Sequence, residues 1–204
     1  MNIGIIGAGN IGSTLGKCWK DAGHAIVYGV RDPAVERYRA LAGENSVLGI
    51  ADAIGSADVV LLATPGNALA GLLAANADAL DGALVIDASN QIPGEAFHQL
   101  PLFADLTPGA RVYRAFNTLG WENFADPVIE GERPDLFYSG PEGADRTTIE
   151  ALIADVGLRP VYVGEGANAA DILDGVARLW FTLMRREGHR HLAFRTLGLD
   201  PLQD

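Results

Sequence analysis

The stretch "GIIGAGNIGSTLG", residues 4–16, decides the fold of this chain. It places Gly7, Gly9 and Gly12 in the spacing G-x-G-x-x-G, between a short apolar segment and a helix-length one. In such a turn the first glycine permits a tight bend, the second lets the backbone approach a pyrophosphate, and the third allows the helix to pack close to the strand. The stretch therefore predicts a dinucleotide-binding turn, and a glycine-rich turn that serves packing alone is the alternative.

Short apolar segments and helix-length segments alternate along most of the chain. The apolar segments are NIGIIG, HAIVYG, ADVVLLA, GALVIDA, RVYRAF, DLFYSG and RPVYVG, with VLGI at 47–50 as a weaker candidate. The expected helices between them cover 11–22, 33–42, 68–79 and 145–156. Strands that are apolar throughout and alternate with helices are typical of a parallel sheet covered on both faces. We therefore predict an α/β fold, a doubly wound and mostly parallel sheet of the Rossmann type.

The pattern changes near residue 166, which divides the chain into a predicted Rossmann domain (1–165) and a C-terminal helical extension (166–204). A helix is expected over 169–187, with a second short helix after it. Such a short extension cannot hold its own core, so it should pack on the sheet domain or on a partner subunit. Apolar residues of the helix, such as Leu179, Phe181 and Leu183, favour a homodimer.

The extension is also rich in arginine. Between Arg178 and Arg195 there are five arginines against one acid, Glu187. Cations are favoured near the C-terminus of a helix, which explains part of this pattern. The alternative is a binding surface for an acidic substrate.

Composition narrows the classes of partner. The net charge of -11 argues against a nucleic acid or an anionic membrane surface, because both require a basic face. Cys18 is the single cysteine, which fits a reducing compartment. The N-terminus shows no basic leader, and no apolar run reaches membrane-spanning length. We expect a cytoplasmic protein with a small-molecule partner. Because no histidine or carboxylate cluster has ligand spacing, no metal site is expected.

Arg31 follows the second predicted strand, in the stretch GVRDP at 29–33. In a Rossmann fold this position lies beside the adenosine ribose, where an acid binds the 2′-hydroxyl of NAD and an arginine accommodates the 2′-phosphate of NADP. Asp32 is adjacent, but neighbouring residues at a strand end point in opposite directions. We favour Arg31 and hence NADP, with Arg37 as a possible second contact. The alternative is a surface ion pair with Asp32 or Glu36, a kind of pair that contributes little.

Two further loops follow predicted strands at the same sheet edge, where open α/β sheets bind ligands. We expect both loops to border the nicotinamide half of the cofactor, with small residues leaving room for its ring. The ASN run at 88–90 is also compatible with a turn that caps the next helix. The predicted cofactor contacts of the first helix and these loops are Asn10, Ile11, Ala63, Thr64, Pro65, Ala88, Ser89 and Asn90.

The segment RAFNTLGWENFADP at 114–127, together with GAGNIGSTLG, GVRDP, LLATPGNA and VIDASNQ, resembles the NADPH-dependent oxidoreductases that reduce the deazaflavin coenzyme factor 420. The reductase domain of the STEAP metalloreductases shares this layout. The resemblance covers nearly the whole chain. It implies that Phe116, Asn117 and Thr118 line the cleft beside the nicotinamide. We assign Asn117 and Thr118 to polar anchoring of the nicotinamide or the acceptor ring.

The resemblance implies hydride transfer between NADP(H) and a planar acceptor, with the deazaflavin coenzyme as the expected co-substrate. Close relatives carry Ser-Arg after the second strand, whereas this chain has Val30 and Arg31. Two other functions are compatible with the sequence: a flavin or ferric-chelate reductase, and a module that senses NADP(H) without turnover. In hydride transfer between two stacked rings the protein supplies orientation, so no acid–base pair is required.

Overall fold

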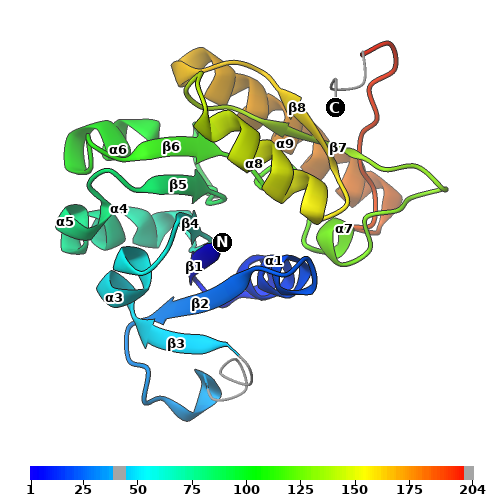
Figure 1. The fold of residues 1–204 in the computed structure, drawn as a ribbon. Helices are drawn as coiled ribbons and strands as arrows, with labels where there is room; N and C mark the ends of the chain where they lie inside the picture. Colours follow the sequence, from blue (N-terminus) through cyan, green and yellow to red (C-terminus); the bar gives the residue numbers. More distant parts are fainter. Residues whose placement is uncertain (39–44, 200–204) are drawn as a thin grey trace.

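The computed structural model describes residues 1–38 and 45–199. A six-stranded sheet in the order β3-β2-β1-β4-β5-β6 forms its centre, and every neighbouring pair is parallel (Figure 1). The strands are β1 (Asn2–Ile6), β2 (Ala25–Val30), β3 (Ser46–Gly49), β4 (Val59–Leu62), β5 (Leu84–Asp87) and β6 (Arg111–Arg114). This order and direction confirm the predicted doubly wound α/β fold of the Rossmann type. The weak candidate near residue 47 is the edge strand β3.

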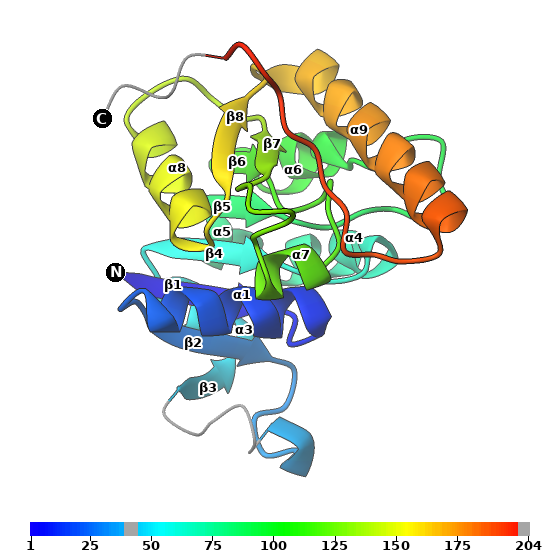
Figure 2. The same ribbon diagram turned by 90° about the vertical axis from the view of Figure 1, so that its right-hand side faces the viewer.

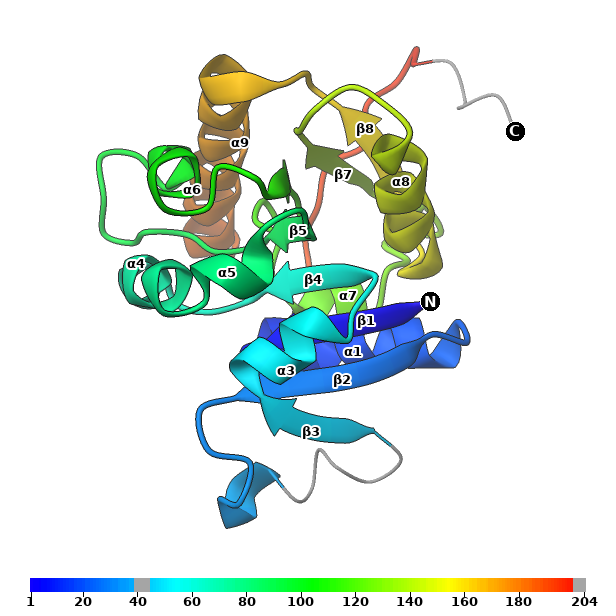
Figure 3. The ribbon, with the colours of Figure 1, turned by 60° about the vertical axis from the view of Figure 1, so that its left-hand side comes forward.

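Helices cover both faces of the sheet, as its apolar strands require. Figure 3 brings forward α3 (Ile50–Gly55), α4 (Gly66–Ala75), α5 (Ala77–Leu80) and α6 (Leu100–Leu106). Figure 2 brings forward α1 (Asn10–Asp21), α7 (Glu122–Ala125) and α8 (Asp145–Asp155). Along β4 the side chains alternate between the two cores: Val59 and Leu61 pack with Trp19 of α1, while Val60 and Leu62 pack with the α3 and α4 side. The strands of the main sheet therefore contribute side chains to both hydrophobic cores, one on each face of the sheet.

The last two strands do not extend this sheet. β7 (Asp135–Tyr138) and β8 (Arg159–Tyr162) form a separate two-stranded parallel sheet, on which α8 packs. An antiparallel bridge between Arg114 and Ser139 joins the two sheets at the end of β6. Trp19 of α1 ties α8 to the main core, because its indole N–H donates to the Leu152 carbonyl at 2.9 Å.

The C-terminal extension contains one long helix, α9 (Gly166–Glu187). It ends at Gly188, whose φ of 74° is a conformation that glycine adopts readily. The prediction of a second short helix is wrong for the described residues. Over the described range 188–199 the chain has no helix, reverses direction and passes β7 (Figure 2). The side chains of Asn123, Trp180 and Arg159 donate hydrogen bonds to backbone carbonyls of this segment. The Asp135 N–H donates to the Phe194 carbonyl at 2.8 Å. These tertiary contacts replace the hydrogen bonds of a helix.

One more expected helix differs from the structure. In the segment 33–42 the described part holds only a 3-10 turn, Glu36–Tyr38, and residues 39–42 lie outside the described residues. The division of the chain at residue 165 falls directly before α9 and stays a prediction. Over the described ranges, no helix combines the length and the apolar character needed to cross a bilayer.

Candidate nucleotide-binding site

A pocket of about 900 Å³ opens at the carboxyl ends of β1, β4 and β5, where the predicted motifs meet. A second cavity of about 670 Å³ adjoins it, and both are lined by Gly7, Ala8, Tyr38 and Thr64. Eleven of the sequence-predicted residues line the larger pocket: Gly7, Gly9, Asn10, Ile11, Ala63, Thr64, Pro65, Ala88, Asn90, Phe116 and Asn117. The structure thus brings residues from four separate motifs to one continuous hollow.

The three motif glycines have different surroundings. A Cβ on Gly7 would lie 2.5 Å from the Ala63 carbonyl oxygen, and its φ of 111° is strained for other residues. A Cβ on Gly12 would lie 1.9 Å from the Gly7 oxygen, so Gly12 serves the close packing of α1 against the turn. Gly9 lines the pocket, and a Cβ on it would meet nothing within 4 Å. The backbone at Gly9 is therefore open to a ligand.

The N-terminus of α1 fits an anionic group at the same place. Gly9 is its N-cap, no side chain caps the helix, and no acid lies in its first turn. Unpaired N–H groups at a helix N-terminus favour phosphate. The Thr64 hydroxyl oxygen is buried nearby and has no hydrogen-bond partner among the described residues. These features fit the pyrophosphate of a dinucleotide.

Arg31 lies at the other end of the site. It lines the smaller cavity together with Val30, Tyr38 and residues of α4. Asp32 does not line either cavity, because its carboxylate closes its own turn by accepting the Ala34 N–H at 3.0 Å. Of the two adjacent charged residues after β2, Arg31 therefore lines the cavity and Asp32 does not. The side chain of Arg37, the predicted second contact, lies outside the description.

Arg114, at the end of β6, is the functional-site residue that sequence reasoning missed. Its side chain is fully buried, and its guanidinium donates to the carbonyl of Ser89 (2.7 Å) and to the side chains of Asp87 (3.0 Å), Asn90 (2.7 Å) and Asp174 (3.0 Å). A buried charge of this kind requires paired partners. No local signal distinguishes Arg114 from Arg111 of the same strand, whose side chain is 49% exposed, and the partners of Arg114 lie 24 or more residues away in the sequence.

Two of the predicted side-chain amides, those of Asn90 and Asn117, are held by this arginine. Asn90 donates from Nδ2 to the Asn117 carbonyl at 2.9 Å and accepts from Arg114 through Oδ1. In the amide orientation that its neighbours require, Asn117 Oδ1 accepts from Arg114 Nη2 (3.1 Å) and Nε (3.2 Å). Arg114 therefore fixes both amides at the floor of the pocket.

Three predicted contacts do not line either cavity: Gly12, which is buried in the turn, and Ser89 and Thr118. Ser89 is 2% exposed, and its hydroxyl donates to the Asp87 carboxylate at 2.6 Å. Thr118 is 1% exposed, its hydroxyl is buried, and it does not line the pocket. Both side chains lie behind the wall formed by their neighbours. Phe116 lines the pocket and has a φ of 61°, which is unusual for a bulky residue; such strained residues cluster at functional sites.

Aromatic residues line the pocket beyond the predicted nicotinamide position. These are Trp121 from the loop before α7, and Trp180 and Phe181 from α9, with Arg190 beside them. The guanidinium carbon of Arg190 lies 5.2 Å from the centroid of a Trp180 ring, and Nε donates to Glu122 at 2.6 Å. Flat apolar walls with one cation can receive a planar molecule that carries negative charge.

The other tail arginines have different contacts. Arg178 lies over the Phe97 ring, Arg186 contacts its neighbour Glu187, and Arg195 lies close to Asp135. Among the described arginines of this tail, only Arg190 lines the larger pocket. The arginine-rich pattern therefore divides into one pocket residue and several surface contacts.

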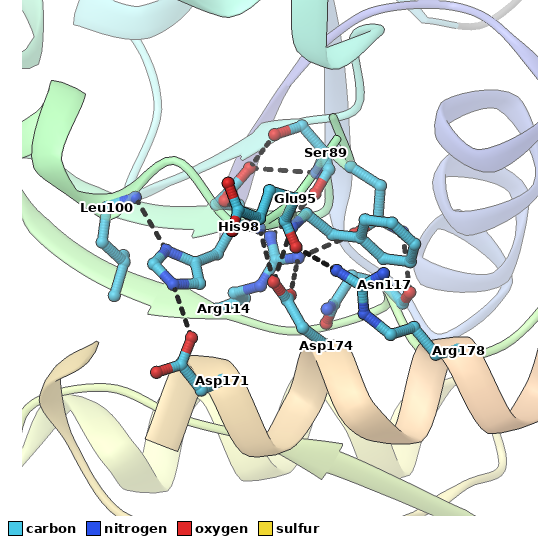
Figure 4. Close-up of polar contacts among 12 residues, drawn as sticks. Ser89, Glu95, His98, Leu100, Arg114, Asn117, Asp171, Asp174 and Arg178 are labelled. Carbon is cyan, nitrogen blue, oxygen red and sulfur yellow. Dashed lines mark hydrogen bonds and ion pairs between the residues drawn. The ribbon is translucent and has the colours of Figure 1, made fainter. Parts of the chain in front are cut away.

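One cluster of possible metal ligands appears only in the folded chain. His98, Asp171 and Asp174 have ligand atoms within 4.8 Å of one another. The His98 ring contacts Asp171 at 3.2 Å, and both Asp174 oxygens accept hydrogen bonds from Arg114 or from backbone N–H groups (Figure 4). The sequence did not indicate this group because His98 lies 73 residues before Asp171 and 76 before Asp174.

Comparison with known proteins agrees with the site. Residues 2–91 match the family described as NADP oxidoreductase, coenzyme F420-dependent. The chain carries a domain of this family. The matched region holds the glycine turn, Arg31 and the loops after β4 and β5, so it contains most of the site.

Solved structures share the fold. A protein from Arthrobacter sp. FB24, proposed to be an F420-dependent NADP reductase, is 23% identical, with a TM-score of 0.83, over 96% of this chain and 99% of that one. A hypothetical protein from Sinorhizobium meliloti is 31% identical (TM-score 0.66), over 81% and 85% of the two chains. A reductive aminase from Aspergillus terreus, solved with NADPH and ethyl levulinate, is 21% identical (TM-score 0.69), and this chain covers 62% of it. The first of these structures therefore shares its fold with nearly the whole of this chain, beyond the residues that match the family.

Proposed function

We propose that this protein transfers a hydride between NADP(H) and a planar acceptor, and that the acceptor is the deazaflavin coenzyme F420. One observation carries the proposal: a single pocket joins an open glycine turn at one end to aromatic walls at the other. A dinucleotide fits the first part and a flat ring system fits the second. The family description, which names both NADP and F420, supports the same pairing.

The residues of the site have distinct tasks in this proposal. Gly9 and the N-terminus of α1 hold the pyrophosphate, and Arg31 accommodates the 2′-phosphate. Ala63 and Ala88 leave room for the nicotinamide, which supplies the hydride chemistry when bound. Asn117 anchors the ring at the floor of the pocket. No residue has to move a proton, since orientation of two rings is the task of the protein.

The aromatic walls complete the site. Trp121, Trp180 and Phe181 exclude water and hold the acceptor parallel to the nicotinamide, because flat apolar surfaces favour stacked rings. Arg190 faces the same space and favours an acceptor that carries negative charge. The proposed fit of the deazaflavin coenzyme rests on this combination of a planar ring and an anionic chain.

The test is an assay of the purified protein with NADPH and a series of acceptors. The decrease in nicotinamide absorbance is followed with the deazaflavin coenzyme, with FMN and with a ferric chelate. Fastest turnover with the deazaflavin supports the proposal. Preference for FMN or the chelate would make the protein a flavin or metal-chelate reductase. Tight NADPH binding without turnover of any acceptor would favour a sensing module.

We also propose that the protein is a homodimer in which α9 is covered by a second copy. Ile172 and Leu179, two turns apart on α9, are 52% and 50% exposed. Exposed apolar side chains on one helix face are typical of an interface. Sedimentation of the purified protein measures its mass directly, and a monomer at all concentrations would contradict this proposal.

A further inference from the structure

The side chain of Asp174 reaches from α9 to the floor of the pocket. It is 4% exposed, and its two oxygens have different partners (Figure 4). Oδ1 accepts from Arg114 Nη2 at 3.0 Å, while Oδ2 accepts the backbone N–H groups of Phe97 (2.6 Å) and His98 (3.0 Å). One carboxylate therefore joins the C-terminal helix to the end of β6 and to the loop before α6.

Arg114 passes this connection on to the pocket. The same Nη2 atom that contacts Asp174 also donates to Asn90 Oδ1 at 2.7 Å and lies 3.1 Å from the Asn117 amide oxygen. On its other side, Nη1 donates to Asp87 and to the Ser89 carbonyl. Because the guanidinium is fully buried and each of its partners is a paired acceptor, this network has little freedom to rearrange.

We propose that Asp174 is a positioning residue for the nicotinamide half of the site. It holds the Arg114 guanidinium in the orientation that fixes the amides of Asn90 and Asn117. This inference rests on the proposed function, since it assigns a task within the same pocket.

The network also determines what the pocket offers to a ligand. Both ends of the Asn90 amide are bound within the protein. The Asn117 oxygen is held by Arg114, so its Nδ2 group is the part of that amide left for a ligand. The floor of the pocket therefore presents a hydrogen-bond donor, which suits a carbonyl oxygen such as that of the nicotinamide carboxamide.

The contact between Asp174 and Arg114 also fixes the position of α9 relative to the floor of the pocket. Trp180, which forms part of the acceptor wall, lies on the same helix and is buried. Because α9 is continuous from Gly166 to Glu187, the Asp174 contact sets the distance between the amide floor and the aromatic wall. Two stacked rings react only when such spacing is kept.

Two variants break the Asp174–Arg114 contact from opposite sides. Asp174→Asn keeps the contacts of Arg114 with Asp87 and Ser89, whereas Arg114→Lys keeps the contacts of Asp174 with the backbone of residues 97–98 but lacks the forked guanidinium. Asp171→Asn is the matched control, because Asp171 lies one turn earlier on α9, is 67% exposed in its side chain and contacts His98 only at the surface.

Calorimetry of these proteins with two probes separates positioning from a general structural role. The probes are NADPH and adenosine 2′,5′-bisphosphate, which is the adenosine half of NADP without the nicotinamide. For both test variants we expect the dissociation constant of NADPH to rise on the order of tenfold, as for a displaced hydrogen bond, with that of the bisphosphate unchanged. The Asp171→Asn control should bind both probes as the unaltered protein does.

The outcomes are distinct. Equal weakening of both probes, or no weakening of either, would overturn the inference. Failure of both test variants to fold would also overturn it, because the pair would then serve the fold and not the pocket. If the unaltered protein binds neither probe, the proposed function itself fails. Normal binding by the unaltered protein with no selective loss in the variants refutes the positioning role alone.

Discussion

Replacement of Gly9 by alanine separates nucleotide binding from folding. Gly9 has a φ of -79° and a ψ of -171°, a conformation that alanine adopts without strain, and its added Cβ would touch nothing within 4 Å. The methyl group would instead occupy the space where the pyrophosphate is expected. Gly9→Ala should therefore fold normally and bind NADPH poorly.

The size of both effects follows from these contacts. Alanine restricts the unfolded chain, which raises the free energy of unfolding by about 0.4–1 kcal/mol where the native conformation is compatible. Loss of one charge-assisted hydrogen bond to a displaced phosphate costs roughly 1.5–3 kcal/mol, and each 1.4 kcal/mol of this is about tenfold in affinity. We expect the dissociation constant of NADPH to rise at least about tenfold while the protein becomes no less stable.

Gly12→Ala provides the opposite case. Its Cβ would lie 1.9 Å from the Gly7 oxygen and 3.1 Å from Ile5 Cγ2, so the turn or the helix must move. Overpacking of this kind costs about 1–3 kcal/mol. For a chain of this size the melting temperature should fall by roughly 2–4 °C per kcal/mol. Binding should also decline, because the turn itself is distorted.

Thermal unfolding and calorimetric titration with NADPH, run on the same samples, measure the two effects. Gly55→Ala is the matched control, since Gly55 is exposed at the end of α3 and its Cβ would also meet nothing within 4 Å. If Gly9→Ala protein bound NADPH with unchanged affinity, the reasoning would be refuted, because the backbone at Gly9 could not then lie against the pyrophosphate.

Three further predictions concern charged residues. Arg31→Ala should weaken NADPH more than NADH, because the arginine faces the cavity beside the ribose; titration with both nucleotides checks this, and an unchanged ratio would return Arg31 to a surface role. Arg190→Glu should raise the Michaelis constant of the deazaflavin acceptor and leave that of NADPH unchanged, whereas Arg186→Glu, at an exposed site outside the pocket, should change neither in steady-state assays. Burial alone would raise the pKa of Asp135, but hydrogen bonds from Arg159 and the tail backbone outweigh it and lower that pKa. The stabilisation is therefore present above the ordinary carboxyl pKa and is lost as pH falls through the lowered value, so Asp135→Asn should lower the melting temperature at pH 7 and differ less from the unaltered protein in acid; a constant difference across that range would contradict this.

The sequence by itself determined the sheet and the turn at its centre. The apolar segments predicted the six strands of the main sheet, because strands buried on both faces must be apolar along their whole length. The spacing of Gly7, Gly9 and Gly12 predicted the turn, because Gly7 and Gly12 answer local steric demands and Gly9 keeps the backbone open to a ligand. Loops such as 63–65 and 88–90 could be placed at one edge, since parallel strands end on the same side.

Only the tertiary structure decided how the floor of the pocket is held. Arg114 is one of two arginines in the four-residue strand β6, and its partners Asp87 and Asp174 lie 27 and 60 residues away. No local pattern indicates which distant acid will neutralise a buried cation. The same holds for the extended tail after Gly188, whose backbone groups are satisfied by side chains of other elements and not by neighbours in sequence. Local sterics and periodicity are encoded in adjacent residues, whereas the pairing of buried charges and backbone groups depends on the distances that folding creates.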